Sequence, residues 1–136
     1  MSTGRTFRSA TADDQDDGRF RRCPNADYVL EGNGEVVDHG LVSPVPAEFT
    51  IINMQTRPGF ERKGHGRYFV TELEKLAIRG GASKIYAYDV GADSEGFWKK
   101  LGYSLDHKIV PAGVEVEIWS KSLSAHTSPG TTRTVR

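Results

Sequence analysis

The chain of 136 residues is long enough for one domain with one hydrophobic core, and its 37% of hydrophobic residues is typical of a globular protein. Lysine and arginine together number 18, as do aspartate and glutamate, so no net charge favours nucleic acid or an anionic membrane as a partner. Cys23 is the only cysteine, which excludes an intramolecular disulfide, and no apolar run is long enough to span a membrane, so we expect a cytoplasmic protein.

The two ends of the chain are predicted to be polar tails. Residues 1–26 combine five arginines with an acidic cluster at positions 13, 14, 16 and 17, and they show no hydrophobic periodicity. Such a carboxylate run is usually solvated, so we assign no metal site to it. Residues 124–136 are polar as well, which leaves residues 27–123 as the folded domain.

Three antiparallel strands are predicted to open this domain. Residues 28–31 and 35–42 flank Asn33 and Gly34, a dipeptide that readily adopts the positive φ angles of a tight hairpin. A third apolar run follows at residues 49–56. The short links between the three runs favour an antiparallel meander.

A long helix is predicted to follow the third strand. Its apolar positions recur at helical spacing: Phe69, Leu73, Leu76, Ala77 and Gly80. Gly80 and Gly81 are expected to end this helix, and residues 84–90 then resume as a strand. Strand, helix and strand in this order predict a right-handed crossover and a central parallel strand pair.

The rest of the domain is predicted to be a short helix and two strands. Asp93 is a candidate N-cap for a helix that carries Phe97 and Trp98 inward and ends at Gly102. Residues 103–110 and 114–123 alternate as strands. The predicted fold class is therefore α+β, with a mixed sheet that begins as an antiparallel meander and continues into a central parallel pair.

The loop at residues 57–66 is predicted to bind an anion, and in particular a phosphate. The first N–H groups of the following helix are unpaired at the positive end of its dipole, and three side chains add full charges: Arg62, Lys63 and Arg67. Gly64 and Gly66 let the backbone approach a ligand closely. No Gly-Lys-Ser/Thr and no third glycine follow, so the loop is neither a Walker loop nor a dinucleotide-binding loop. On this loop alone, an ordinary surface turn is the alternative.

Three segments together resemble the GCN5-related N-acetyltransferase (GNAT) family. The loop resembles the family's Arg/Gln-x-x-Gly-x-Gly/Ala motif, residues 97–103 resemble its aromatic-aromatic-x-Lys-x-Gly-Phe segment, and residues 118–123 resemble its closing strand. The resemblance covers residues 27–123 and implies acetyl-CoA as the cosubstrate, without a metal. It also implies two central strands that splay apart to admit pantetheine.

The same resemblance assigns the cofactor-binding residues. Backbone groups near three residues of the third strand would pair with pantetheine: Met54, Gln55 and Thr56. The pyrophosphate would lie on the loop residues Glu61, Arg62, Lys63, Gly64, His65, Gly66 and Arg67.

Three departures from the family pattern bear on function. Glu61 stands at the Arg/Gln position of the loop, and Trp98 stands where many relatives have the tyrosine that protonates the thiolate. The family's leading strand and first two helices have no predicted counterpart before Asp27. For the general base we predict Asp89, at the end of a central strand, where a carboxylate can face the cleft. A carboxylate that only bonds nearby backbone N–H groups is the equal alternative.

Two functions follow from this sequence. The first is an acetyl-CoA-dependent N-acetyltransferase acting on an amine of a protein or a small molecule. The alternative is a catalytically weak or inactive subunit that keeps the fold and works in a larger assembly, whose partner would order the tails. The four histidines and one cysteine lack metal-ligand spacing, so no zinc site is expected.

Overall fold

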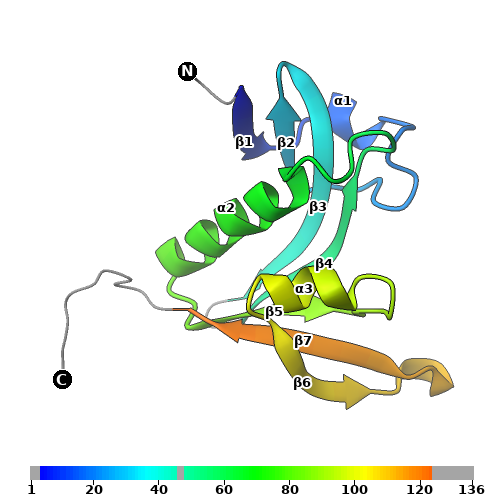
Figure 1. Ribbon diagram of the computed structural model, residues 1–136, viewed down its shortest axis with the longest axis vertical. Helices are drawn as coiled ribbons and strands as arrows, with labels where there is room; N and C mark the ends of the chain where they lie inside the picture. The colour runs from blue at the N-terminus through cyan, green and yellow to red at the C-terminus, as the bar shows by residue number, and fades with distance from the viewer. Residues whose placement is uncertain (1–3, 46–47, 124–136) are drawn as a thin grey trace.

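A computed structural model describes residues 4–45 and 48–123 of the chain (Figure 1). Seven strands form one mixed sheet in the order β1-β2-β3-β4-β5-β7-β6. The strands are β1 (Arg5–Ser9), β2 (Tyr28–Gly32), β3 (Glu35–Val45), β4 (Glu48–Thr56), β5 (Lys84–Tyr88), β6 (Ser104–Ile109) and β7 (Val116–Ser122). The helices are α1 (Ala12–Gln15), α2 (His65–Arg79) and α3 (Glu95–Lys100), with a 3₁₀ turn at Pro111–Gly113.

The predicted meander is confirmed. β2, β3 and β4 pair antiparallel in sequence order. The β2–β3 hairpin turns at Asn33 and Gly34, which have φ angles of 53° and 85°. These left-handed conformations match the right-handed twist of the flanking strands.

The crossover through α2 is confirmed as well. β4 and β5 are parallel neighbours, and α2 lies along one face of the sheet (Figure 1). Its buried side chains are Phe69, Val70, Leu73 and Ala77. The helix ends as predicted, with Gly81 at a φ of +92°.

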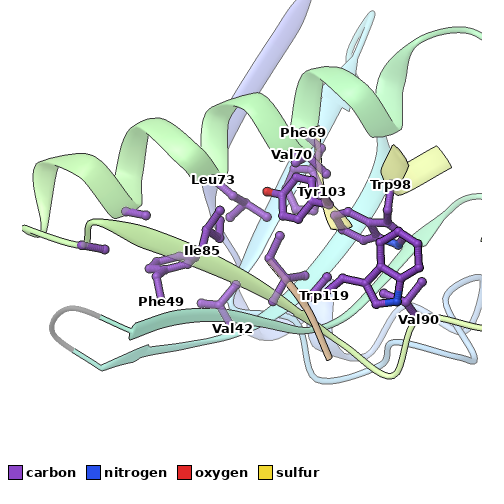
Figure 2. Packing of buried hydrophobic residues seen from close by; sticks show 14 of the residues in the cluster. Val42, Phe49, Phe69, Val70, Leu73, Ile85, Val90, Trp98, Tyr103 and Trp119 are labelled. Atoms are coloured by element: carbon purple, nitrogen blue, oxygen red, sulfur yellow. The ribbon is translucent and has the colours of Figure 1, made fainter. Parts of the chain in front are cut away.

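The core fills the space between α2, α3 and the sheet. Figure 2 shows this cluster, with Phe49 toward one end and Trp98 and Trp119 toward the other. Each large apolar side chain buried here stabilises the fold by about 1.5–3 kcal/mol. α3 carries Trp98 inward as predicted, but Ser94 rather than Asp93 precedes its first turn, and no side chain caps it.

The prediction of an N-terminal tail is wrong for the described residues 4–26. β1 pairs with β2 along its whole length. Phe7 stacks on Tyr28 at 5.3 Å between ring centroids and also contacts Phe69. Arg8 binds the carboxylates of Asp14 at 2.6 Å and Glu31 at 2.7 Å. The segment is thus held by strand pairing and ion pairs, neither of which produces a hydrophobic period in sequence.

The chain after α1 covers the sheet face opposite α2. Gly40 lies beneath Phe69 of α2, so its neighbour His39 points to the other face. There Phe20 stacks on the His39 ring at 3.7 Å, and His39 Nδ1 lies 2.9 Å from the Cys23 carbonyl oxygen. Burial raises the pKa of the Cys23 thiol to about 11, so it is no nucleophile at neutral pH. The predicted C-terminal tail, residues 124–136, lies outside the described residues.

Candidate active site

β4 and β5 pair over only three residues and then separate. Their register runs from Phe49 opposite Ile85 to Ile51 opposite Ala87. At this point Ile52 is an extra residue on β4, because β3 pairs Leu41 with Asn53 and Val42 with Ile51. A β-bulge of this kind bends its strand. β4 therefore departs from β5 while it stays paired to β3 as far as Thr56.

A cleft of about 400 Å³ opens between the separated strand ends. Its lining comes from four elements and consists of Leu41, Ile51, Ile52, Asn53, Met54, Tyr88, Asp89, Ser94 and Trp98. Asp89, the predicted base, is exposed at this cleft directly after β5, in a left-handed conformation with a φ of 60°. Trp98 is buried and presents no hydroxyl group here.

The edge of β4 beside the cleft has two N–H groups that do not pair with β3. The Arg57 N–H donates to the Val37 carbonyl at 2.7 Å, so by strand alternation the N–H of Gln55 faces β3. The N–H groups of Met54 and Thr56 then face the cleft. The Met54 N–H is bonded to the side chain of its neighbour Asn53 at 2.8 Å. Of the three predicted pantetheine partners, Met54 and Thr56 thus present their N–H groups to the cleft.

The loop before α2 forms a second, larger pocket of about 810 Å³. It is lined by Thr56, Phe60, Glu61, Arg62, Gly64, His65, Gly66, Arg67, Asp93, Ser94, Gly96, Phe97, Lys100 and Leu101. Among the described residues, no protein acceptor binds the backbone N–H groups of residues 62–66. Of the predicted loop residues, only Lys63 lies outside this lining. Ser94 lines both pockets, so they adjoin at this residue, and we refer to the two together as the groove.

Glu61 lines the loop pocket but uses its carboxylate within the loop itself. Its carboxylate accepts a hydrogen bond from the Gly59 N–H at 2.9 Å and so stabilises the turn that precedes it. Arg62 follows in a left-handed conformation with a φ of 63°. The departure from the family's Arg/Gln position is therefore compatible with an anion-binding loop.

The N-terminal strand braces this loop through Arg5, which sequence reasoning missed. Its Nη2 donates to the Lys63 carbonyl at 2.8 Å, and its Nε donates to His65 Nδ1 at 3.2 Å. The guanidinium also lies 5.1 Å from the centroid of the Tyr68 ring. Burial, together with the positive charges of Arg5 and Lys63, lowers the pKa of His65.

A second missed residue, Asp38, is buried behind the pocket wall. Its carboxylate accepts a hydrogen bond from Thr56 Oγ1, and its other oxygen has no partner among the described residues. Burial raises the pKa of Asp38 to about 7, although Thr56 and Arg5 oppose the shift. No sequence motif marks this aspartate.

Comparison with known proteins identifies the family. The sequence profile of the Acetyltransferase (GNAT) family matches residues 3–103. The chain belongs to this family. The match includes the N-terminal segment as well as the loop. Among curated proteins, none matches the chain in sequence.

Solved acetyltransferase structures share the fold. Ard1 from Thermoplasma volcanium aligns with a TM-score of 0.72 and 15% identity, over 89% of this chain and 99% of its own. The ribosomal-protein-S18-alanine N-acetyltransferase from Escherichia coli aligns with a TM-score of 0.70 and 15% identity, over 96% of this chain and 99% of its own. Arabidopsis thaliana Naa50, in complex with a bisubstrate analogue that contains CoA, aligns with a TM-score of 0.65 and 12% identity, over 88% of this chain and 99% of its own. The predicted family and the predicted α+β fold are thus confirmed.

Two features are absent from the described residues, a metal-binding cluster and a membrane-spanning helix. No group of three or more histidine, cysteine, aspartate or glutamate side chains among them could hold a metal ion. Within the same part of the chain, no helix has the length and apolar character needed to cross a membrane.

Proposed function

We propose that this GNAT-family protein is an acetyl-CoA-dependent N-acetyltransferase that acts on an amine of a protein or a small molecule. One observation carries the proposal, namely this groove, in which the loop pocket and the strand cleft adjoin at Ser94. Unpaired backbone N–H groups lie at one end of it, and the open edge of β4 runs toward the other. An elongated ligand with a diphosphate at one end and an amide-bearing arm fits this distribution of donors.

The backbone of residues 62–66 would bind the pyrophosphate, with Arg62 and Arg67 adding positive charge at the pocket. The edge of β4 at Met54 and Thr56 would pair with the pantetheine amides as a further strand does. For this pairing the Asn53 side chain must release the Met54 N–H, which it now bonds. The thioester would then lie in the cleft beside Asp89.

Acetyl transfer needs a neutral amine held close to the thioester carbonyl carbon. The amine nitrogen forms a bond to this carbon, and the carbon–sulfur bond breaks as the tetrahedral intermediate collapses. Asp89 would accept the amine proton, and the CoA thiolate would leave. Because Trp98 cannot serve as an acid, the proton for the thiolate would come from water or from a cleft hydroxyl of Tyr88 or Ser94.

The structural neighbours support two classes of acceptor as proposals for this chain. Structural neighbours named above act on a ribosomal-protein alanine or bind a CoA–peptide conjugate, and a nourseothricin acetyltransferase aligns over 71% of the chain with a TM-score of 0.62. Both a protein amine and a small amine are therefore proposed acceptors. A NatB complex is also among the neighbours, so assembly with a partner chain is a further proposal.

Trp98 is the observation that favours the second candidate, a weakly active or inactive subunit. Its buried indole occupies the helix position from which many relatives supply an acid. The two candidates differ in turnover and not in cofactor binding. Release of free CoA thiol that depends on an added peptide or small amine supports the enzyme, whereas binding without such release supports the subunit.

The binding step is tested by calorimetric titration of acetyl-CoA into the wild type and Arg67→Glu. This arginine is exposed on the first turn of α2, where a glutamate favours the helix dipole, so we expect stability to be kept or raised. A reversed charge beside the phosphates should weaken acetyl-CoA binding at least about tenfold, or about 1.4 kcal/mol.

Arg79→Glu is the matched control, because it changes the net charge equally at the other end of α2. Twelve residues of helix place it roughly 18 Å away, beyond the screening length at physiological salt. Its affinity should stay within about twofold of the wild type. The proposal fails if the wild type does not bind acetyl-CoA at millimolar concentration, or if both variants bind equally well.

A further inference from the structure

A charged side chain from the edge strand β1, that of Arg5, contacts the loop before α2. Arg5 lies opposite Gly32 on β2, and both face α2. The missing side chain at Gly32 leaves room for the His65 ring, because a Cβ there would lie 3.1 Å from His65 Cε1. The imidazole is therefore enclosed between bare backbone on β2 and the guanidinium from β1.

The contact with Arg5 determines where the proton of His65 resides. Arginine Nε can only donate, so Nδ1 of His65 must accept and is unprotonated. The neutral ring then carries its proton on Nε2, and the ring lines the loop pocket. The loop thus has an uncharged donor where histidine often provides a cation.

Charged groups on the surrounding elements favour the same neutral form. Burial opposes a positive ring most, and Arg5 from β1 and Lys63 from the loop oppose it as well, so the pKa of His65 is lowered. Glu61 of the loop is bonded to Gly59 instead, and Gly32 of β2 is uncharged. Asp38 of β3 is a buried carboxylate in the field of Arg5.

We propose that Arg5 is a positioning residue of the cofactor loop, which fixes the Lys63 carbonyl and holds His65 as an uncharged Nε2–H donor toward a phosphate group. The inference rests on the proposed acetyl-CoA function. With His65 held neutral by Arg5, the affinity of the loop for a phosphate group does not change with histidine protonation near neutral pH. It also gives the edge strand β1 a role in ligand binding besides its pairing with β2.

The state of the ring is tested in the ligand-free protein by ¹⁵N NMR of the histidine side chains, with His65→Asn used to assign the resonances. We expect His65 to be neutral at pH 7 with Nε2 protonated. In Arg5→Met its titration midpoint should rise toward the ordinary value of about 6.5. Arg79→Met, which removes an exposed arginine at the far end of α2, should leave the midpoint unchanged.

Arg5→Lys separates charge from geometry. Lysine keeps the positive charge but lacks the planar fork, so the midpoint should stay low while Nδ1 and Nε2 share the proton. The proposal is overturned if wild-type His65 is charged at pH 7, if its proton lies on Nδ1, or if removing Arg5 leaves the midpoint unchanged. If Arg5→Met fails to fold, the ¹⁵N NMR spectra of the wild type and of Arg5→Lys still test the proposal, because they report the charge and the proton position of His65.

The effect on ligand binding is measured as the ratio of the CoA dissociation constant of Arg5→Met to that of the wild type, from pH 5.5 to 8. The ratio cancels the ionisation of CoA itself. It should be about tenfold at pH 8 and fall several-fold toward pH 5.5, where the released histidine becomes a cation. A ratio independent of pH contradicts the role of Arg5, whereas a wild type that binds no CoA contradicts the proposed function.

Discussion

The protonation of Asp38 is determined by its buried surroundings, and no sequence motif marks this residue. It has no exposed surface, and among the described residues only one of its carboxylate oxygens has a partner. That partner, Thr56, is 18 residues away and also lines the loop pocket. The protonation of Asp38 is therefore linked both to folding and to the wall of the binding groove.

The substitution Asp38→Asn tests this linkage. The pKa of Asp38 is about 7 in the folded protein and near 3.8 when unfolded, so the folded state binds the proton more tightly. The stability from this proton is complete below about pH 4 and is lost as the pH rises through 7. Asparagine cannot titrate, so the variant should be the more stable at pH 8, by up to about 4 kcal/mol.

Urea unfolding at pH 4.5 and pH 8 measures the difference between the two proteins. We expect the wild type to lose stability relative to Asp38→Asn between these pH values. A variant that is less stable than the wild type at pH 8 would show that ionised Asp38 is needed, through its attraction to Arg5.

Helices and turns were predictable from local sequence patterns, whereas contacts between residues far apart in the sequence were not. The hairpin at Asn33 and Gly34, the helix α2 and its end at Gly81 were predictable because turn chemistry and periodicity lie within a few residues. β1 was missed because its stability comes from β2 and from ion pairs of Arg8. The hydrogen bond from Arg5 to the Lys63 carbonyl joins residues 58 positions apart, and a single sequence gives no indication of such a contact.

The close approach of α2 to the sheet depends on Gly40. A Cβ at this position would lie 2.6 Å from the Phe69 ring, too close for a real contact. Gly40→Ala should therefore push α2 from β3 and destabilise the fold by about 1–3 kcal/mol in thermal or urea unfolding.

Phe69→Leu supplies the control for this prediction, because a smaller side chain makes room for the new methyl group. The double variant should be more stable than the sum of the two single effects predicts, with a coupling of about 1 kcal/mol. Additive effects would show that Gly40 is needed for its backbone conformation and not for the space above it.

At the scale of the whole molecule, the sheet consists of two parts joined by a short parallel ladder. β1 to β4 form one part and β5, β7 and β6 the other, with α2 crossing between them (Figure 1). The groove lies where the two parts separate, beyond the bulge at Ile52. The sequence resemblance predicted this separation. The residues that line it could not be read from the motifs, because Asn53 is placed by strand register and Ser94 by the start of α3.

The most direct test of the account is to map CoA on the ¹⁵N-labelled protein by amide chemical shifts. With saturating CoA, the account predicts large shifts for the loop amides of Arg62, Gly64 and Gly66 and for Met54 and Thr56 on the open edge of β4. Amides of the β6–β7 hairpin tip, at residues 110–114, should hardly move. An absence of shifts at millimolar CoA, or shifts confined to residues outside the groove, would contradict the account.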